Sequence, residues 1–463
     1  MSSIATYERF LVKMNSNTDF KKLLAEYVSC KSVSSDDRML SGMKDAREFL
    51  LEFFNKISIP AKEIGFGGHE IVFAQTEQHH DLPTILIYGH YDVQPANDEE
   101  MWDSDPFSLV EKNGRLYSRG ASDNKGCNLS LLLAVRDIIE KNKKLPVNLK
   151  FVLEGEEEIG SVSIPKFLNT MKDELYADFA LISDTWTFSE NTMVITSGLR
   201  GLVGCEIELH GQDQDLHSGY GGCILNPIQA LANMCSKLHD KDGYVAIDGF
   251  YDDVREPYDF ECQQIKELPM SDDDLKKSLG VKFFKLPNKK FSAAETMRFL
   301  PTLEFNGITG GFQGNGIKTI IPCKASAKIT CRLVNDQNSE NIKNLLMKKL
   351  KELCPKEMSM SLKFEQSCNP YFLDIKNVRN DVLSRAINTA NSGIEKVFGK
   401  RPIYLRDGGS IGLVTMLKEI LGIDSLLIGL TTSEDNIHGI NESISIEMVE
   451  RGRKFFSWFL SNL

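Results

Sequence analysis

Side chains able to bind metal ions follow three short apolar runs in the first half of the chain. The runs span 83–88, 147–153 and 178–183, and each is typical of a buried strand. Ligands of open α/β sheets bind beyond the carboxyl ends of the strands, so we expect the side chains found there to lie close together. If each of these side chains had its own structural role, their occurrence together at one edge of the sheet would be a coincidence. These side chains are His90, Asp92, Glu157, Glu158 and Asp184.

Two further candidates come from other parts of the chain. Asp123 precedes a predicted helix, where an aspartate often serves only as a cap, and His438 follows the last apolar strand. With one glutamate of the acidic run, the set offers two imidazoles and three carboxylates, which suit zinc, with manganese or cobalt as alternatives. Five ligands on one ion would leave no open position, so we expect two divalent ions per subunit that share a carboxylate.

Two spacings add detail to this hypothesis. His90 and Asp92 are two residues apart, so near a strand end they can project from the same face. Asp92 could then accept the second imidazole N–H and fix the orientation of the ring. Glu157 and Glu158 are adjacent and point apart in an extended chain. One of them can therefore bind metal while the other acts as general base on a water that both ions share.

The elements that must position these residues alternate between strands and helices. Helical patterns at 126–142 and 164–175 lie between the apolar runs, which implies crossover connections and a mostly parallel sheet. After about residue 198 the pattern becomes that of an antiparallel α+β domain, with elements at 202–209, 227–238, 325–333, 339–353 and 358–364. The β–α alternation then returns at 382–398, 403–405, 411–420, 425–430 and 446–460.

We therefore predict an α/β catalytic domain, with a mixed sheet flanked by helices, that is interrupted by an inserted α+β domain. The catalytic domain takes residues 1–199 and 379–463, and the insertion takes residues 200–378. Within the insertion, residues 250–300 are charge-rich and irregular, with a helix start at Asp272. Three consecutive domains are the alternative. We favour the insertion because it brings His438 back to the sheet that the first half of the chain forms.

Composition excludes several classes of protein. The 463 residues hold 54 Lys+Arg against 65 Asp+Glu, a net charge of −11, which argues against binding to a nucleic-acid backbone. The longest apolar run, 129–135, is too short for a membrane span, and Glu8 and Arg9 interrupt any signal peptide. Ten cysteines without a CxxC motif indicate reduced, buried thiols. We expect a cytoplasmic protein with no nucleic-acid or membrane partner.

Three motifs together resemble a known enzyme family. The segments 89–95 (GHYDVQP), 119–126 (RGASDNKG) and 154–161 (EGEEEIGS) are similar to the signature of dinuclear zinc peptidases of the carnosinase and cytosolic nonspecific dipeptidase type, within the carboxypeptidase/aminoacylase superfamily. The resemblance implies that Asp92 orients His90 and that Glu157 is the general base that passes a proton to the leaving amine. It also implies five metal ligands, with His90 and Asp184 on one ion, Glu158 and His438 on the other, and Asp123 bridging both.

The inserted domain carries matching residues as well. Segment 215–219 resembles the family's lid motif, in which His217 would reach the active site of the partner subunit and stabilise the oxyanion, so the resemblance implies a homodimer. Asp407 stands where the family often has glutamate, a difference that bears on recognition of the substrate's amino end. The residues that the resemblance assigns to substrate binding are Thr319, Arg332, Arg406 and Ser410.

The favoured function is therefore a dipeptidase. A hydroxide bridging two metal ions would attack the peptide bond of a dipeptide or short peptide with a free C-terminal carboxylate. An N-acyl amino acid amidohydrolase of the same family is the alternative, and a non-catalytic binding protein is disfavoured because every site position is filled. The segments 409–412 and 310–316 lack the patterns of a serine nucleophile elbow and of a P-loop.

Overall fold

The structure is a computed structural model that describes residues 16–96, 101–142 and 144–463. Glu8 and Arg9, on which the expectation about a signal peptide depends, lie outside the described residues. The chain divides into two compact units: the first comprises Met1–Ser197, Leu373–Tyr404 and Met416–Leu463, and the second comprises Gly198–Phe372 and Leu405–Thr415. No helix among the described residues is long and apolar enough to cross a membrane.

The first unit is built on a mixed sheet whose central strands are parallel. Strand β3 pairs in parallel with β6 and β7, and β17 pairs in parallel with β7. The sheet runs in the order β1, β2, β6, β3, β7, β17, β8, β15, with β16 beside β8, and its outer pairs are antiparallel. Its strands are β1 (Ala61–Ile64), β2 (Ile71–Gln75), β3 (Thr84–His90), β6 (Asn148–Glu154), β7 (Phe179–Ile182), β8 (Val194–Leu199), β15 (Tyr371–Phe372), β16 (Ile403–Arg406) and β17 (Ser425–Leu427). Of these, β15 and the last two residues of β8 and of β16 belong to the second unit.

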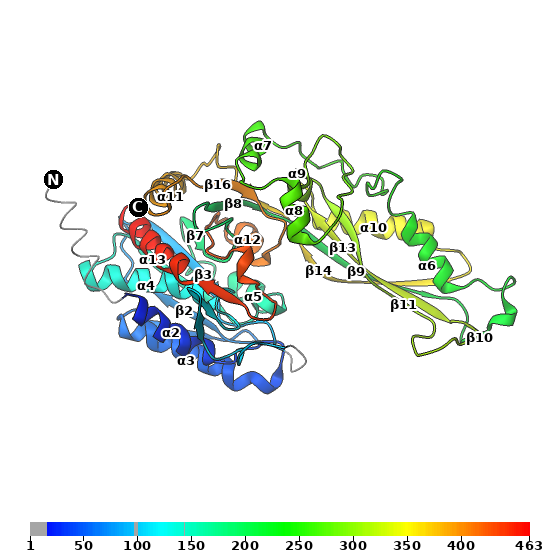
Figure 1. The fold of residues 1–463 in the computed structure, drawn as a ribbon, viewed down its shortest axis with the longest axis horizontal. Helices are drawn as coiled ribbons and strands as arrows, with labels where there is room; N and C mark the ends of the chain where they lie inside the picture. The colour runs from blue at the N-terminus through cyan, green and yellow to red at the C-terminus, as the bar shows by residue number, and fades with distance from the viewer. Residues whose placement is uncertain (1–15, 97–100, 143) are drawn as a thin grey trace. The chain divides into compact units, whose positions relative to one another are not determined.

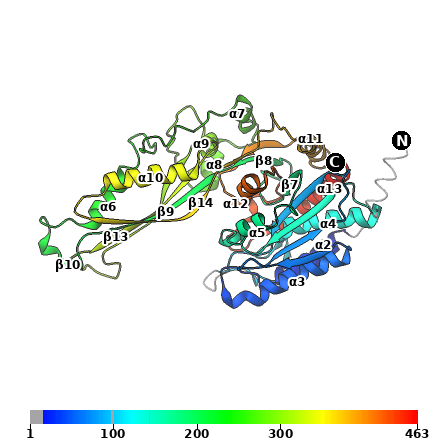
Figure 2. The ribbon, with the colours of Figure 1, turned by 180° about the vertical axis from the view of Figure 1, so that it is seen from behind.

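Helices cover this sheet, which explains why its central strands β3 and β6 are buried throughout. Every residue of β3 and of β6 is buried, as parallel strands covered on both faces require. Figure 1 shows α13 in front of the sheet, and Figure 2, from the opposite side, shows α5 in front of it. The helices of this unit are α2 (Ser16–Ser29), α3 (Leu40–Lys56), α4 (Lys125–Asn142), α5 (Ile164–Thr170), α11 (Asp381–Phe398) and α13 (Ile446–Ser461).

A small antiparallel sheet joins distant parts of the chain. It contains β4 (Val110–Lys112), β5 (Arg115–Tyr117) and β18 (Ser443–Ser445), in the order β18, β5, β4. Pairing of β18 with β5 aligns Ser443 with Tyr117. The loop that leads into α4 therefore starts next to the chain that follows His438.

The second unit is a four-stranded antiparallel sheet with two helices against one face. Residues alternate between buried and partly exposed along β9 and β13, as expected of a sheet with one covered face. The buried set packs with Leu231 of α6 and Leu346 of α10 in one apolar core. The main elements are β9 (Gly201–His210), α6 (Pro227–Ser236), β11 (Thr302–Gly310), β13 (Lys324–Leu333), α10 (Ser339–Leu353) and β14 (Ser359–Cys368).

The predicted fold class is confirmed, and the differences are local. Helix α5 ends at Thr170 rather than 175, and strand β17 ends at Leu427 rather than 430. Helix α12 (Gly412–Met416) passes into a π-helical turn, Leu417–Leu421, where one helix over 411–420 is predicted. Segment 250–300 contains α7 (Asp259–Lys266), α8 (Asp272–Leu279) and α9 (Ala293–Phe299), of which only the start of α8 is predicted.

All ten cysteines are free thiols, in agreement with the absence of a disulfide pattern. The expectation that they are buried is correct for only four of them. Five are partly exposed and Cys223 is exposed. Burial raises the pKa of Cys127 and of Cys331 to about 12, so these two thiols are held in the unreactive form.

Candidate metal centre

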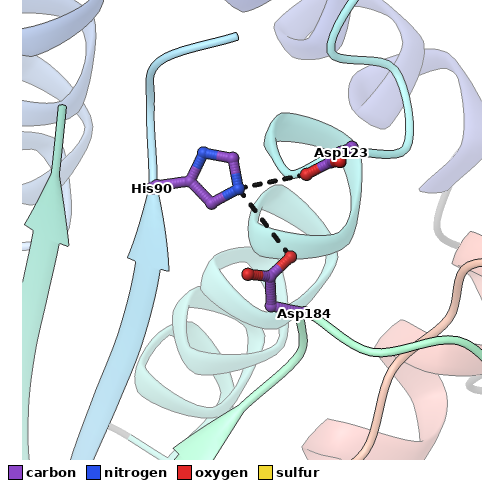
Figure 3. Close-up of side chains that lie close together, drawn as sticks. All are labelled: His90, Asp123 and Asp184. Carbon is purple, nitrogen blue, oxygen red and sulfur yellow. Dashed lines mark hydrogen bonds and ion pairs between the residues drawn. The ribbon is translucent and has the colours of Figure 1, made fainter. Parts of the chain in front are cut away.

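His90 meets two carboxylates at the carboxyl edge of the main sheet. Strand β3 ends at His90, Asp123 lies in the loop before α4, and Asp184 follows β7. The Nε2 atom of His90 lies 3.1 Å from Oδ1 of Asp123 and 3.8 Å from Oδ1 of Asp184, as Figure 3 shows. His90 is fully buried. The parallel strands therefore bring a first group of three possible metal ligands together.

The second oxygen of Asp123 faces another group of ligands. Nε2 of His438 lies 3.0 Å from Oδ2 of Asp123 and 3.4 Å from Oε2 of Glu158. These three residues form a second set whose ligand atoms all lie within 4.8 Å of one another, like the first set. Since Asp123 belongs to both sets and presents one oxygen to each, its carboxylate has the geometry of a bridging ligand.

Asp92 connects the two sides of this centre. Its backbone oxygen lies 3.0 Å from Nδ1 of His90, and its carboxylate Oδ1 lies 3.3 Å from the same nitrogen. The same carboxylate accepts the backbone N–H groups of Glu157 and Glu158 at 3.3 and 3.1 Å. Asp92 is thus close enough to orient the imidazole, and it also holds the 3₁₀ turn Glu157–Ile159.

Charge in the centre is unbalanced without a cation. Burial raises the pKa of Glu157 above its usual range, and burial followed by repulsion from Asp123 raises the pKa of Glu158 to about 7. Burial alone would lower the pKa of His90, but the carboxylates of Asp184 and Asp123 raise it well above its usual value. These upward shifts follow from the burial of several carboxylates close to one another and to the imidazole of His90. Divalent cations would relieve this repulsion, and the nitrogen and oxygen donors fit them.

Three supporting residues were not found from the sequence. Gln94 donates from Nε2 to Oε2 of Glu158 at 2.7 Å, and Asn124 donates from Nδ2 to Oδ1 of Asp184 at 2.8 Å. Gln94 lies inside the motif 89–95 and Asn124 inside the motif 119–126, so the sequence already placed both residues close to the expected site. Glu442 accepts backbone N–H groups of the Asp123 loop, and no pattern around it marks this role.

In the second unit, the structure brings His217 and Thr319 together. Strand β10 (Leu216–His217) pairs with β12 (Ile320–Ile321), with His217 opposite Ile320. The next residue, Ser218, donates its N–H to the backbone oxygen of Thr319 at 2.9 Å. His217 is exposed, and its Nδ1 accepts the N–H of Gly219 at 3.0 Å. Because Nδ1 accepts this bond, the Nε2 atom is the ring nitrogen of His217 that could interact with a further group.

Arg332 and Ser410 form a second pair in the same unit. Nη1 of Arg332 donates to Oγ of Ser410 at 2.8 Å, and Oγ of Ser410 donates to the backbone oxygen of Arg200 at 2.5 Å. Arg332 lies eight residues along β13 from its start at Lys324, where the chain arrives from β12. At about 3.3 Å per residue, β13 separates Arg332 from Lys324, near Thr319 in sequence, by about 25 Å within one subunit.

Arg406 is engaged elsewhere. Its guanidinium donates to both oxygens of Glu261, at 2.6 and 2.7 Å, and the residue is only 3% exposed. The rings of Phe299 and Phe372 lie about the guanidinium, with centroids at 4.9 and 5.1 Å. Glu261 therefore holds one edge of the guanidinium, while Nη1 of Arg406 is buried without a hydrogen-bond partner among the described residues.

Comparison with known proteins agrees with the metal centre. The model of peptidase family M20/M25/M40 matches residues 86–462. The chain is 30% identical to a Cys-Gly metallodipeptidase of Schizosaccharomyces pombe over 96% of this chain and 95% of that one. It is 33% identical to the human Beta-Ala-His dipeptidase over 81% of this chain and 74% of that protein.

Solved structures give the same result. An M20 family metallo-carboxypeptidase from Sulfolobus solfataricus superposes with a TM-score of 0.85 at 32% identity, covering 97% of this chain and 99% of that one. Human carnosine dipeptidase 1 superposes with a TM-score of 0.81 at 28% identity, covering 96% of each chain. The region that matches the family model contains every element that carries the two ligand groups, apart from the first two residues of β3. The chain therefore belongs to the metal-dependent peptidases of family M20/M25/M40.

Proposed function

We propose that this chain is a dipeptidase that uses two divalent cations, zinc first and manganese or cobalt as alternatives. The observation that carries the proposal is the placement of Asp123, whose two carboxylate oxygens each face a separate histidine at about 3 Å. We assign His90 and Asp184 to one cation, Glu158 and His438 to the other, and Asp123 to both. The dipeptidase names of similar proteins from fission yeast and human support the substrate class.

The residues of the chain would share the work of peptide hydrolysis. When bound, the cations would supply Lewis acidity, which would polarise the peptide carbonyl and lower the pKa of the attacking water. Glu157 accepts the proton of the attacking water and passes it to the leaving amine. Its raised pKa suits this role, because a carboxyl that titrates nearer to neutrality can both take up and release a proton. Asp92 holds the turn that carries Glu157.

For substrate binding we assign the free carboxylate to Arg332, with Ser410 beside it. A guanidinium binds a carboxylate through two parallel hydrogen bonds, and the serine fixes one edge of that fork. We propose that Arg406, which is buried, supports substrate binding indirectly. It holds the loop that carries Ser410 through its pair with Glu261. We infer that Asp407, on the same loop, faces the amino end of the substrate.

We further propose that the enzyme acts as a homodimer. His217 lies on β10, and Thr319 directly precedes its partner strand β12. The length of β13 between Lys324 and Arg332 is about 25 Å, so we infer that one short substrate cannot contact His217, Thr319 and Arg332 of the same chain. A second copy would supply His217 and Thr319 together to the partner's substrate. The imidazole would then stabilise the oxyanion that forms during attack. Under this proposal the insertion, residues 200–378, serves as lid and dimerisation domain between the catalytic segments 1–199 and 379–463.

One assay tests the proposal against its alternative. The purified protein is freed of metal with a chelator, reloaded with zinc, manganese or cobalt, and given a panel of Xaa-Gly dipeptides beside N-acetyl amino acids. We expect hydrolysis of dipeptides that requires added metal and little release of acetate. Faster hydrolysis of N-acetyl amino acids would replace the dipeptidase by an amidohydrolase of the same family. Full activity after complete metal removal would refute both.

A further inference from the structure

We propose that Glu442 is a positioning residue that fixes the bridging carboxylate of Asp123 and thereby sets the affinity of the site for its cations. Glu442 is fully buried and is not one of the possible metal ligands of the two groups. The inference rests on the proposed dinuclear function and adds to it a residue that controls how tightly the cations are held.

The carboxylate of Glu442 accepts four hydrogen bonds from one short loop. Oε1 accepts the backbone N–H groups of Ser122 and Asp123, each at 2.9 Å. Oε2 accepts the N–H of Gly120 and Nη1 of Arg119, also at 2.9 Å. These donors include the peptide N–H of Asp123 itself, so the backbone of the bridging residue is bonded directly to Glu442.

Arg119 extends this anchor to the other ligand-bearing loops. Its Nη2 faces the backbone oxygens of Pro95 and His438, at 3.4 Å each. Pro95 lies in the loop that follows His90, and His438 is itself in the second ligand group. The buried pair of Glu442 and Arg119 therefore connects the loops that carry the two histidines with the loop that carries Asp123.

The backbone of Glu442 is held independently of its side chain. Its carbonyl oxygen accepts the N–H of Ser118 at 3.0 Å, and the following residues pair with β5 as strand β18. A substitution of the side chain should therefore leave the strand in place. Glutamine keeps the shape but replaces one acceptor oxygen by an NH₂ group, which would face N–H donors and repel them. We expect the Asp123 loop to shift in Glu442→Gln while the sheet stays formed.

Cobalt binding gives a direct measure of this effect. Metal-free wild type and Glu442→Gln are titrated with Co²⁺ by calorimetry, and the visible absorption of the bound Co²⁺ reports its coordination. We expect Glu442→Gln to bind Co²⁺ about ten to a hundred times more weakly, with an altered spectrum. Glu442→Asp, which keeps both acceptor oxygens on a shorter side chain, should recover part of the affinity.

Asp137→Asn is the matched control. Asp137 of α4 accepts two hydrogen bonds at 2.6 Å from Arg453 of α13, a similar carboxylate–arginine pair in the same unit that touches none of the possible ligands. We expect Asp137→Asn to lower the melting temperature while it keeps the wild-type Co²⁺ affinity. A loss of affinity in this control equal to that of Glu442→Gln would make the effect one of general stability and overturn the proposal.

Two further outcomes are decisive. Wild-type affinity and spectrum in Glu442→Gln would refute the role of Glu442 and leave the dinuclear function standing, whereas a wild type that binds no Co²⁺ would refute the function itself. If Glu442→Gln fails to fold, Glu442→Asp provides the test, because it keeps both acceptor oxygens but shortens the side chain that reaches the N–H groups of Ser122 and Asp123. Wild-type Co²⁺ affinity in a folded Glu442→Asp would then overturn the proposal.

Discussion

The carboxylate of Asp92 accepts the backbone N–H of Glu158 at 3.1 Å, so the residue that faces the His90 imidazole also holds the turn that carries a proposed ligand of the other cation. A single side chain thus connects both halves of the centre. The same carboxylate also holds Glu157, the proposed general base, since the N–H of Glu157 lies 3.3 Å from the other oxygen.

This relationship predicts the effect of Asp92→Asn. The amide keeps one acceptor oxygen, so it cannot face His90 Nδ1 and accept both backbone N–H groups of the turn. We expect kcat to fall about a hundredfold and the binding of both cations to weaken. Steady-state kinetics and metal analysis by mass spectrometry measure the two effects. A variant with full metal content and wild-type kcat would show that Asp92 has no positioning role.

Glu157→Gln separates proton transfer from metal binding. The amide cannot accept a proton from water, whereas Asp123 and the other assigned ligands are unchanged. We expect kcat to fall by a factor of about a hundred to ten thousand while two cations remain bound. Glu156→Gln is the matched control, because Glu156 is buried beside it but accepts the N–H groups of His69 and Ser163 instead. Wild-type activity in Glu157→Gln would assign the base to another group.

The sequence predicted the parts of this site that have regular spacing. His90 ends a fully buried strand, and sheet geometry alone places it beside the ends of the neighbouring strands. The partners of buried side chains were harder to predict, because Glu442 and Arg119 are 323 residues apart and neither lies in a periodic pattern that points to the other. The same reason applies to Arg406, because nothing in the sequence indicates its pairing with Glu261, 145 residues away.

The stability of the metal-free protein should fall as the pH rises. Burial raises the pKa of Glu154 to about 8 and that of Glu158 to about 7, and neighbouring carboxylates raise the pKa of His90. In each case the folded protein binds a proton that the unfolded chain releases at lower pH, so the free energy of unfolding decreases as the pH rises from about 5 to about 8. Cations replace these protons, and their stabilising effect should therefore increase over the same range.

Thermal melting measures this dependence. We expect the melting temperature of chelator-treated protein to drop by about 5 °C or more from about pH 5 to about pH 8, and that of zinc-loaded protein to change less. Glu154→Gln should reduce the slope, because the amide cannot ionise and can still accept the hydroxyl hydrogen bonds of Tyr88 and Ser161. A metal-free protein that becomes more stable as the pH rises would contradict the sign of this prediction.

Arg332 and Arg406 should behave differently when they are truncated. Arg332→Ala removes the guanidinium that we assign to the substrate carboxylate, so we expect KM to rise at least tenfold with a small change in melting temperature. Arg406→Ala leaves the carboxylate of Glu261 buried without its main partner, which should cost about 3–5 kcal/mol of unfolding free energy. Denaturation and kinetics of both variants make the comparison. An unchanged stability in Arg406→Ala together with a raised KM would return Arg406 to direct substrate contact.

The dimer proposal predicts that two inactive variants restore activity when they are mixed. His217→Ala lacks the group that would reach the partner's substrate, and Glu157→Gln lacks the base of its own centre. A mixed dimer holds one centre with an intact Glu157 and an intact His217 from the other chain. After random exchange half of the dimers are mixed, and each has one working site of two, so we expect about a quarter of the wild-type activity. If both residues served the same subunit, every centre in the mixture would lack one of them, and the activity would stay at the level of the separate variants.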